Sequence, residues 1–289
     1  MSGTVAIWNP ASGSAPDAGD LEAALGNDVE FVPTTKDDPG PGQARQAVED
    51  GTDIVIACGG DGTVRACLEP LAGTGTALGI VPLGTGNLLA SNLGIPAGLK
   101  AGGAVGNGPK RRIDLGRVNG EAFAVMAGSG FDALMIRDAD DRLKSKVGTA
   151  AYVLSGAKNL RSELVQTKVT VDGTVWFQGR TTMVLVGNFG KISGGLEVFP
   201  DARPDDGLLD IAVMSASNLR EWASIAWRLV RRQNQQPELA RRTQASHIVV
   251  EHDEPRPYEL DGEDREPTAR LEFTVDHHAI IIHQSGDDS

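Results

Sequence analysis

A glycine-rich loop between a strand-like run and a helical segment constrains the fold of this 289-residue chain more than any other feature. The run Asp53–Cys58 (DIVIAC) is almost continuously apolar, which is typical of a strand buried on both faces of a sheet. Gly59–Thr63 (GGDGT) follows directly, and helical spacing begins at Val64. Glycines without Cβ atoms let backbone N–H groups approach a phosphate, and the positive end of the following helix points at the same place. The sequence therefore predicts a phosphate-binding turn, with a tight turn that holds no ligand as the alternative.

The side chains of this loop suit the same chemistry. Thr63 can cap the helix or donate its hydroxyl to a phosphate oxygen, and Asp61 puts a carboxylate where Mg²⁺ or a bound water would bridge phosphates. The loop has neither the GxxxxGK[ST] nor the GxGxxG spacing, so neither of these common nucleotide motifs explains it. We expect the following residues to bind a nucleotide: Gly59, Gly60, Asp61, Gly62 and Thr63.

A second glycine loop repeats this arrangement. The apolar run Ile80–Leu83 leads into Gly84–Asn87 (GTGN) and then into a short helical segment. Ligands of open α/β sheets bind in a crevice at the carboxyl ends of the strands. Asn9 ends the first strand in the same way, although an Asn-Pro pair alone favours a plain turn. We expect this second set to line the crevice with the first: Asn9, Gly84, Thr85 and Asn87.

The pattern of the chain changes near residue 111. Before this point short strands alternate with helical segments, which predicts βαβ units and a parallel sheet. The expected strands are 4–8, 29–33, 53–58 and 78–81, and the expected helices are 17–25, 42–50, 64–71 and 88–93. We expect residues 1–111 to form an open α/β nucleotide-binding domain.

After residue 111, β-type runs separated by turn signals predict an antiparallel sandwich or barrel. The expected strands are 121–127, 165–171, 175–178, 181–187, 208–214, 247–251, 256–260, 271–275 and 279–283. The pair Asp172-Gly173 between two runs is a hairpin signal, and helices are expected over 142–161 and 219–233. We expect a β-sandwich domain over residues 112–285, and leave open whether its last strand returns to the first domain.

The charge balance limits the kinds of molecule that we expect this protein to bind. A net charge of −12 and a pI of about 4.9 repel nucleic acid phosphates, so we expect no nucleic acid partner. Contact with anionic lipid would have to be local and apolar, or made by a small basic patch. The two cysteines, Cys58 and Cys67, lack metal-ligand spacing and are expected to be buried reduced thiols. With no run of ~20 apolar residues and no signal-peptide pattern, we expect a cytoplasmic protein, with peripheral membrane contact left open.

Taken together, the motifs resemble those of the bacterial diacylglycerol kinase and sphingosine kinase family of lipid kinases. The resemblance runs along almost the whole chain and includes NPASG, GGDGT, PLGTGN, IDLG (113–116), GSGFDA (128–133), LEVFPDARPDDG (196–207) and LDGE (260–263). The GGDGT motif alone is shared with NAD kinases and phosphofructokinases, whereas the later motifs specify the lipid kinases. The resemblance implies an NAD kinase/phosphofructokinase-like N-terminal domain, a C-terminal antiparallel β-sandwich, and ATP in the cleft between them.

The resemblance also implies catalytic and nucleotide-binding roles. The acidic residue of the DGE motif is the family's proposed general base, and it corresponds to Glu263 here. We expect Asp61 to take part in catalysis as well. Thr35 matches a family threonine near the adenosine. The alternative for the DGE motif is that Asp261-Gly262 is simply a hairpin turn like Asp172-Gly173.

A magnesium site is implied by the same resemblance. Asp206 would supply a carboxylate, and Arg203 and Leu208 would supply backbone carbonyls. Asp114 matches an acidic position in an aspartate–water–Mg²⁺ network near the nucleotide. Hard oxygen ligands suit Mg²⁺. The alternatives are a solvated acidic turn around Asp206 and a strand-start role for Asp114.

These observations predict an ATP- and Mg²⁺-dependent kinase of diacylglycerol or a related lipid, acting in phospholipid metabolism at a membrane surface. One departure concerns Leu88, where many bacterial diacylglycerol kinases carry an aspartate. A kinase of a soluble acceptor, like an NAD kinase, and a non-catalytic nucleotide-binding regulator remain alternatives. The sequence leaves the lipid and the oligomeric state open, a homodimer included.

Two helical segments could meet the lipid. The segment 219–233 carries Trp222 on one face and three arginines toward its end, which suits a membrane interface. Packing against the sandwich, with the arginines complementing the helix dipole, explains the same pattern. The segment 144–160 could wall a lipid pocket.

Overall fold

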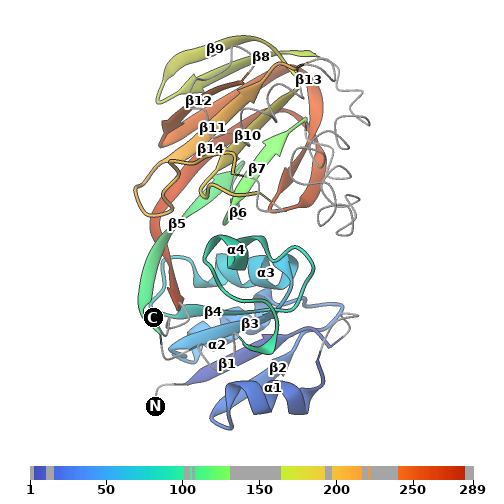
Figure 1. The fold of residues 1–289 in the computed structure, drawn as a ribbon, viewed down its shortest axis with the longest axis vertical. Coiled ribbons are helices and arrows are strands. Elements are labelled where there is room, and N and C mark those ends of the chain that lie inside the picture. Colours follow the sequence, from blue (N-terminus) through green and yellow to red (C-terminus); the bar gives the residue numbers. More distant parts are fainter. Residues whose placement is uncertain are drawn as a thin grey trace. The chain divides into compact units, whose positions relative to one another are not determined.

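The computed structural model of the protein describes residues 3–10, 16–100, 105, 108–130, 164–192, 197–216, 221 and 240–283. The chain divides into two compact units (Figure 1). Unit 1 comprises Met1–Leu115, Pro204–Asp206 and Asp276–Ser289, and unit 2 comprises Gly116–Arg203 and Gly207–Val275. The helix predicted over 142–161 and, apart from Glu221, the one predicted over 219–233 lie outside the described residues.

Unit 1 contains a parallel sheet in the strand order β4-β3-β1-β2. Its strands are β1 (Thr4–Trp8), β2 (Val29–Pro33), β3 (Ile54–Gly59) and β4 (Ala77–Pro82). Its helices are α1 (Ala18–Leu25), α2 (Pro41–Glu49), α3 (Asp61–Leu71) and α4 (Leu88–Asn92). The predicted open α/β fold is therefore confirmed.

The late strand β14 (Glu263–His283) contributes to unit 1 as well. Its last residues run parallel to β4, with Ile281 opposite Ala77 and Ile282 opposite Leu78. The apolar side chains in this end segment are buried, with Ile280 and Ile282 at most 1% exposed. The parallel sheet is thus completed by a segment far along the chain.

Local signals explain where the helices of unit 1 begin. Asp17 caps α1 by accepting a hydrogen bond from the backbone N–H of Asp20 at 2.8 Å, as expected for an N-cap aspartate. Helix α3 begins at Asp61, so residues 61–63 of the GGDGT loop form its first turn rather than preceding a helix that starts at Val64. An acidic residue in a first turn complements the positive helix end, a signal that the apolar spacing alone does not contain.

Unit 2 is built from antiparallel strands in the order β12-β11-β10-β7-β13-β14, with β8 and β9 continuing from β13, and β5 and β6 from β14. The strands are β5 (Lys110–Val118), β6 (Glu121–Phe123), β7 (Met126–Ser129), β8 (Val165–Val171), β9 (Thr174–Thr181), β10 (Met183–Gly187), β11 (Leu209–Met214), β12 (Ala240–Ala245) and β13 (His247–Leu260). Strands β7, β10, β11, β13 and β14 supply most of the buried core, which includes Phe123, Val184, Ile211, Leu260 and Phe273.

Several predicted strand boundaries in unit 2 are wrong. The single strand expected over 121–127 is broken into β6 and β7, while the runs expected at 247–251 and 256–260 join as β13. Register shifts between Glu251 and Tyr258 let β13 stay paired with β14 across the interruption, as β-bulges do. Strand β12 has the polar sequence ARRTQA, which carries no apolar alternation to predict it.

The Asp172-Gly173 hairpin is confirmed. Both residues have positive φ angles, 46° and 80°, and they join β8 to β9 with Val171 opposite Thr174. An Asp-Gly pair suits this turn because glycine and, to a lesser degree, aspartate tolerate the left-handed region.

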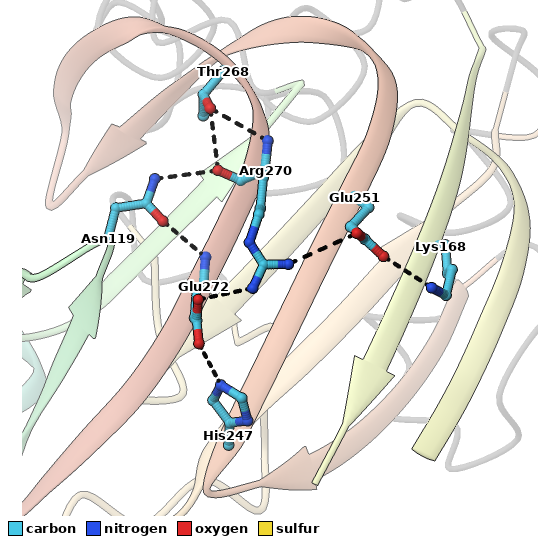
Figure 2. Close-up of polar contacts among 7 residues, drawn as sticks. All are labelled: Asn119, Lys168, His247, Glu251, Thr268, Arg270 and Glu272. Carbon is cyan, nitrogen blue, oxygen red and sulfur yellow. Dashed lines mark hydrogen bonds and ion pairs between the residues drawn. The ribbon is translucent and has the colours of Figure 1, made fainter. Parts of the chain in front are cut away.

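A network of charged side chains links strands on one exposed face of unit 2 (Figure 2). Glu251 lies opposite both Lys168 of β8 and Arg270 of β14, and it accepts a hydrogen bond from Lys168 at 3.0 Å. Arg270 also donates to Glu272 at 2.8 Å, and Glu272 contacts His247 at 2.9 Å. Opposite charges facing across strands favour this register.

Candidate functional site: the edge of the parallel sheet

The register of the parallel strands brings the predicted nucleotide-binding segments to one edge. Trp8 at the end of β1 is opposite both Pro33 of β2 and Cys58 of β3. Gly59 in turn is opposite Pro82 at the end of β4. Asn9, Thr35 and the two glycine loops all follow these carboxyl ends. This is the edge at which open parallel sheets bind their ligands.

The two glycine loops approach each other through bare backbone. A Cβ atom on Gly84 would lie 2.5 Å from the Cα of Gly60, and one on Gly60 would lie 3.3 Å from the Cα of Gly84. Backbone atoms cannot rotate out of the way as a side chain can, so a larger residue at Gly84 would force the loops to shift, and Gly60 has little room for one. The predicted pairing of the loops therefore has a steric basis.

Asp61 joins the first loop to the second. Its Oδ1 accepts a hydrogen bond from the backbone N–H of Leu88, the first residue of α4, at 2.5 Å. A Cβ on Gly86 would lie 2.5 Å from the Asp61 Oδ2, so the second loop packs closely on this carboxylate. Asp61 thus fixes the start of α4, a role that its position in the motif does not reveal.

Asn87 shapes the second loop from within. Its φ angle of 47° is left-handed, a conformation that asparagine tolerates better than most residues. The Asn87 Oδ1 accepts from the Gly84 N–H at 3.0 Å, and its Nδ2 donates to the Gly84 carbonyl at 2.5 Å. The side chain predicted to bind nucleotide is therefore engaged in holding the loop closed.

The remaining predicted nucleotide residues differ in exposure. Thr85 and Gly62 are exposed, whereas Thr63 is only 8% exposed and packs against Gly59. Thr35 is exposed in a turn, where its Oγ1 accepts from the Asp38 N–H at 3.0 Å. The segment after Asn9 and Pro10, residues 11–15, lies outside the described residues.

In unit 2, the DGE motif forms a hairpin with a buried anchor. Asp261 and Gly262 have φ angles of 47° and 85°, so the hairpin reading of this pair is correct. The Asp261 carboxylate also accepts three backbone N–H groups, from Ala124, Val125 and Met126, at 2.7–3.0 Å. These groups lie where the strand predicted over 121–127 breaks, because Asp261 takes the place of a ladder partner.

Glu263, the predicted general base, follows this anchored turn. Its side chain is 40% exposed and lies 3.5 Å from the Nη1 of Arg265. Arg265 also binds the carboxylate of Glu121 through both Nε and Nη2. Hydrogen bonding to Glu121 is the main cause that raises the pKa of Arg265. The guanidinium is thus a fixed positive neighbour of Glu263.

Glu259 is a second carboxyl group near this turn, and we did not predict it from the sequence. Glu259 is 4% exposed, on β13 opposite Gly128 and Asp264. Burial, followed by the charges of Asp264 and Asp261, raises the pKa of Glu259 to about 8. No pattern in the sequence marks it, since the residue precedes Leu260 in an ordinary strand.

The predicted magnesium residues lie around one turn and one strand. Pro204–Gly207 form the turn between Arg203 and Leu208, and Gly207 has a φ of 75°. Asp206 is exposed. Its carboxylate and the backbone carbonyls of Arg203 and Leu208 are hard oxygen donors, so the donor set fits Mg²⁺.

Asp114 adjoins this turn from β5. It is fully buried, and its backbone N–H donates to the Pro204 carbonyl at 2.6 Å. Arg111, three residues earlier, pairs with Asp205 at 2.8 Å. The structure therefore brings Asp114 next to the turn that the sequence singled out for Mg²⁺.

Two family models match this chain. Residues 4–118 match the diacylglycerol kinase catalytic domain, and residues 125–282 match the YegS C-terminal NAD kinase beta sandwich-like domain. A diacylglycerol kinase of Bacillus subtilis (strain 168) is 34% identical over 225 residues, which cover 76% of this chain and 74% of that protein. A Pseudomonas aeruginosa (strain UCBPP-PA14) protein named "Probable lipid kinase YegS-like" is 34% identical over 249 residues, 84% of this chain and 81% of its own.

Solved structures show the same fold. A crystal structure of a diacylglycerol kinase from Bacillus anthracis str. Sterne has a TM-score of 0.75 at 22% identity and covers 98% of this chain and 97% of its own. An NAD kinase from Archaeoglobus fulgidus in complex with ATP has a TM-score of 0.55 at 12% identity, over 98% and 94%. At these identities the likeness concerns the fold alone.

An open α/β unit with two glycine loops at one edge, followed by an antiparallel sandwich, places the chain in the NAD kinase-like fold class. Within this class the chain belongs to the diacylglycerol kinase family of lipid kinases, because both family models match and relatives at 34% identity span most of it. None of the helices in the described ranges is long and apolar enough to span a membrane.

Proposed function

We propose that the protein transfers the γ-phosphoryl group of ATP to the hydroxyl group of a lipid, with diacylglycerol as the first candidate. The observation that carries this proposal is the pair of glycine loops at the edge of the parallel sheet, touching at Gly60 and Gly84 and joined by Asp61. The names of the relatives, diacylglycerol kinase and lipid kinase, support a lipid as the acceptor.

The donor phosphates would bind at the start of α3. The first N–H groups of a helix lack intrahelical partners and carry the positive end of its dipole. Gly62 is exposed in this first turn, and Thr85 is exposed in the second loop. Both suit contact with phosphate oxygens. Mg²⁺, when bound, neutralises negative charge that develops on the transferred group.

On the acceptor side, we assign Glu263 as the general base. A lipid hydroxyl is a poor nucleophile, and a carboxylate within hydrogen-bond reach can take its proton as the new P–O bond forms. The backbone that presents Glu263 is held by the buried Asp261 carboxylate. Asp261 is therefore a positioning residue, and Arg265 limits the directions in which Glu263 can point.

Leu88 occupies the position at which many bacterial diacylglycerol kinases carry an aspartate. Its side chain is 6% exposed, and its backbone N–H is the partner of Asp61. In this chain the position contributes its backbone to the loop and no acidic group to the crevice. This arrangement is compatible with activity, because the loop geometry does not depend on an aspartate there.

The test is a labelling experiment with γ-labelled ATP and Mg²⁺. Diacylglycerol, sphingosine and monoacylglycerol in mixed micelles are compared with NAD in buffer, using the wild type and Glu263→Gln. We expect label in a lipid and its loss in the variant at unchanged thermal stability. Label in no lipid of the panel would refute the proposal, and an active Glu263→Gln protein would refute the assignment of the base.

A kinase of a soluble acceptor is the second candidate, and the fold likeness to an NAD kinase favours it. It predicts labelled NADP without lipid or detergent. The two relatives named as a diacylglycerol kinase and a probable lipid kinase weigh against it.

A further inference from the structure

A buried aspartate and two neighbouring histidines gather in unit 1 beside β5. Asp114 is fully buried, whereas His277 and His278, near the end of β14, are exposed. One potential ligand atom from each of the three residues lies within 4.8 Å of the other two. In the part of the chain that the structure describes, they form the one group of at least three such side chains that satisfies this distance.

The hydrogen bonds of Asp114 orient both histidines. Its Oδ1 lies 2.8 Å from the His277 Nδ1 and accepts the backbone N–H of His278 at 2.7 Å. Metal ligands bind in their deprotonated form. A metal ion would therefore take the place of the proton shared by the Asp114 Oδ1 and the His277 Nδ1 and would bind both atoms, with the remaining proton of the His277 ring on its other nitrogen.

The two imidazole rings are held next to each other. Their centroids are 3.7 Å apart with an angle of 24° between the planes. His278 has a left-handed φ of 55°, which bends the chain so that adjacent residues face the same carboxylate. The His278 carbonyl accepts from Arg112 at 3.3 Å, so the bend is tied to β5 at a second point.

We propose that Asp114, His277 and His278 form a binding site for a borderline divalent transition metal ion, of which Zn²⁺ is the representative. Two imidazole nitrogens and one carboxylate oxygen make a donor set that Zn²⁺ takes up readily, with the fourth position left to water. Mg²⁺ prefers oxygen ligands only. The site is therefore chemically distinct from the oxygen donors of the turn Arg203–Leu208.

Two features of the backbone around these three residues favour binding of a metal ion. All three residues belong to unit 1, so the ligand set does not depend on the arrangement of the two units. Asp114 is anchored through its backbone to Pro204, and β5 is paired with β14. A metal ion would join these two strands and stabilise the folded protein by mass action.

The experiment uses the full chain after removal of metals with a chelator. Zn²⁺ binding is measured by titration calorimetry and by thermal unfolding, and Co²⁺ is used as a visible probe of tetrahedral nitrogen and oxygen ligation. The variants are His277→Gln and His278→Asn, since asparagine tolerates the left-handed backbone at this position. The matched control is His247→Asn, which removes a partly buried histidine of unit 2 that also contacts a carboxylate.

We expect one Zn²⁺ per chain with a rise in melting temperature, retained in excess Mg²⁺. Each site variant should weaken binding by at least about tenfold, and His247→Asn should not change it. Unaltered Zn²⁺ affinity in both site variants would overturn the proposal, as would an equal loss in the His247 control. Circular dichroism of each metal-free variant confirms that a loss of binding is not a loss of fold.

Discussion

At the scale of single residues, three carboxylates of this protein behave differently because their partners differ. Asp61 accepts the N–H that starts α4, Asp261 accepts three N–H groups, and Glu259 is buried next to other acids. A sequence motif shows only that an acidic residue is present. The chemistry of that carboxylate depends on the groups that the fold places next to it.

Glu259 should make stability depend on pH. Its folded pKa of about 8 lies above the unfolded value of about 4.3, so the folded protein binds the proton more tightly. The stabilisation is fully present below the unfolded pKa and is lost as pH rises through about 8, by at most about 1.4 kcal/mol per pH unit. Urea unfolding at pH 6 and pH 9 should show this loss in the wild type and a smaller one in Glu259→Gln. Equal slopes in both proteins would contradict it.

Replacing Asp261 by Asn should destabilise unit 2 and lower catalysis together. An amide nitrogen would face at least one of the three N–H donors, and the loss of bonds to a buried charge costs about 3 kcal/mol. Chemical denaturation and the turnover number measure the two effects.

Asp172→Asn is the matched control for this change. Asp172 occupies the corresponding position of another Asp-Gly hairpin, but its carboxylate accepts from exposed Ser246 and His247. We expect less than about 1 kcal/mol of destabilisation there. If the two variants are equally stable, the hydrogen bonds of the buried Asp261 carboxylate do not stabilise unit 2 as proposed.

At the scale of helices and strands, the sequence predicted those features that depend on residues close together along the chain. The β3–loop–α3 unit and the Asp172-Gly173 hairpin follow from apolar runs and turn residues, and the hairpin at Asp261-Gly262 was the alternative considered for the DGE motif. The Asp261 clamp could not be predicted, because its donors are 135–137 residues away. Strand β12 was missed for a related reason: its pairing with β11, not its own composition, makes it a strand.

The contact between the glycine loops leads to a prediction at this scale. Gly84→Ala would place a Cβ 2.5 Å from the backbone of Gly60 and push the two loops apart. We expect ATP affinity to fall by at least about tenfold, or about 1.4 kcal/mol, measured by calorimetry with a non-hydrolysable analogue. Gly75→Ala is the control, because nothing lies within 4 Å of its added methyl group. Unchanged affinity in Gly84→Ala would show that the loops do not bind nucleotide as a pair.

At the scale of the whole molecule, the chain crosses repeatedly between the two units. Unit 1 takes its residues from three separate segments, the last of which begins at Asp276 within β14. That segment buries Ile280 and Ile282 and pairs with β4. The domain boundary predicted from the sequence divides the chain once, near residue 111. The contacts within the structure instead assign several alternating segments of the chain to the two units.

Removal of residues 276–289 should therefore destabilise the N-terminal unit. Two buried isoleucines contribute roughly 4 kcal/mol by burial of apolar surface, and β4 would lose a partner. Hydrogen exchange of β3 and β4 amides should become faster. Removal of residues 284–289, which lie after β14, is the control. Protection of β4 that is equal in both truncations would contradict the prediction.

The dependence of β4 on β14 also sets an order of events during synthesis. The parallel sheet with the glycine loops emerges from the ribosome first, but its outer partner, Ile281 and Ile282, emerges some 200 residues later by the register of these strands. Until then the edge of β4 has unpaired backbone groups, which is a template for wrong pairing. The newly made protein thus completes its parallel sheet only after the end of β14 has been synthesised, and a nascent chain that stalls in the sandwich remains without this pairing.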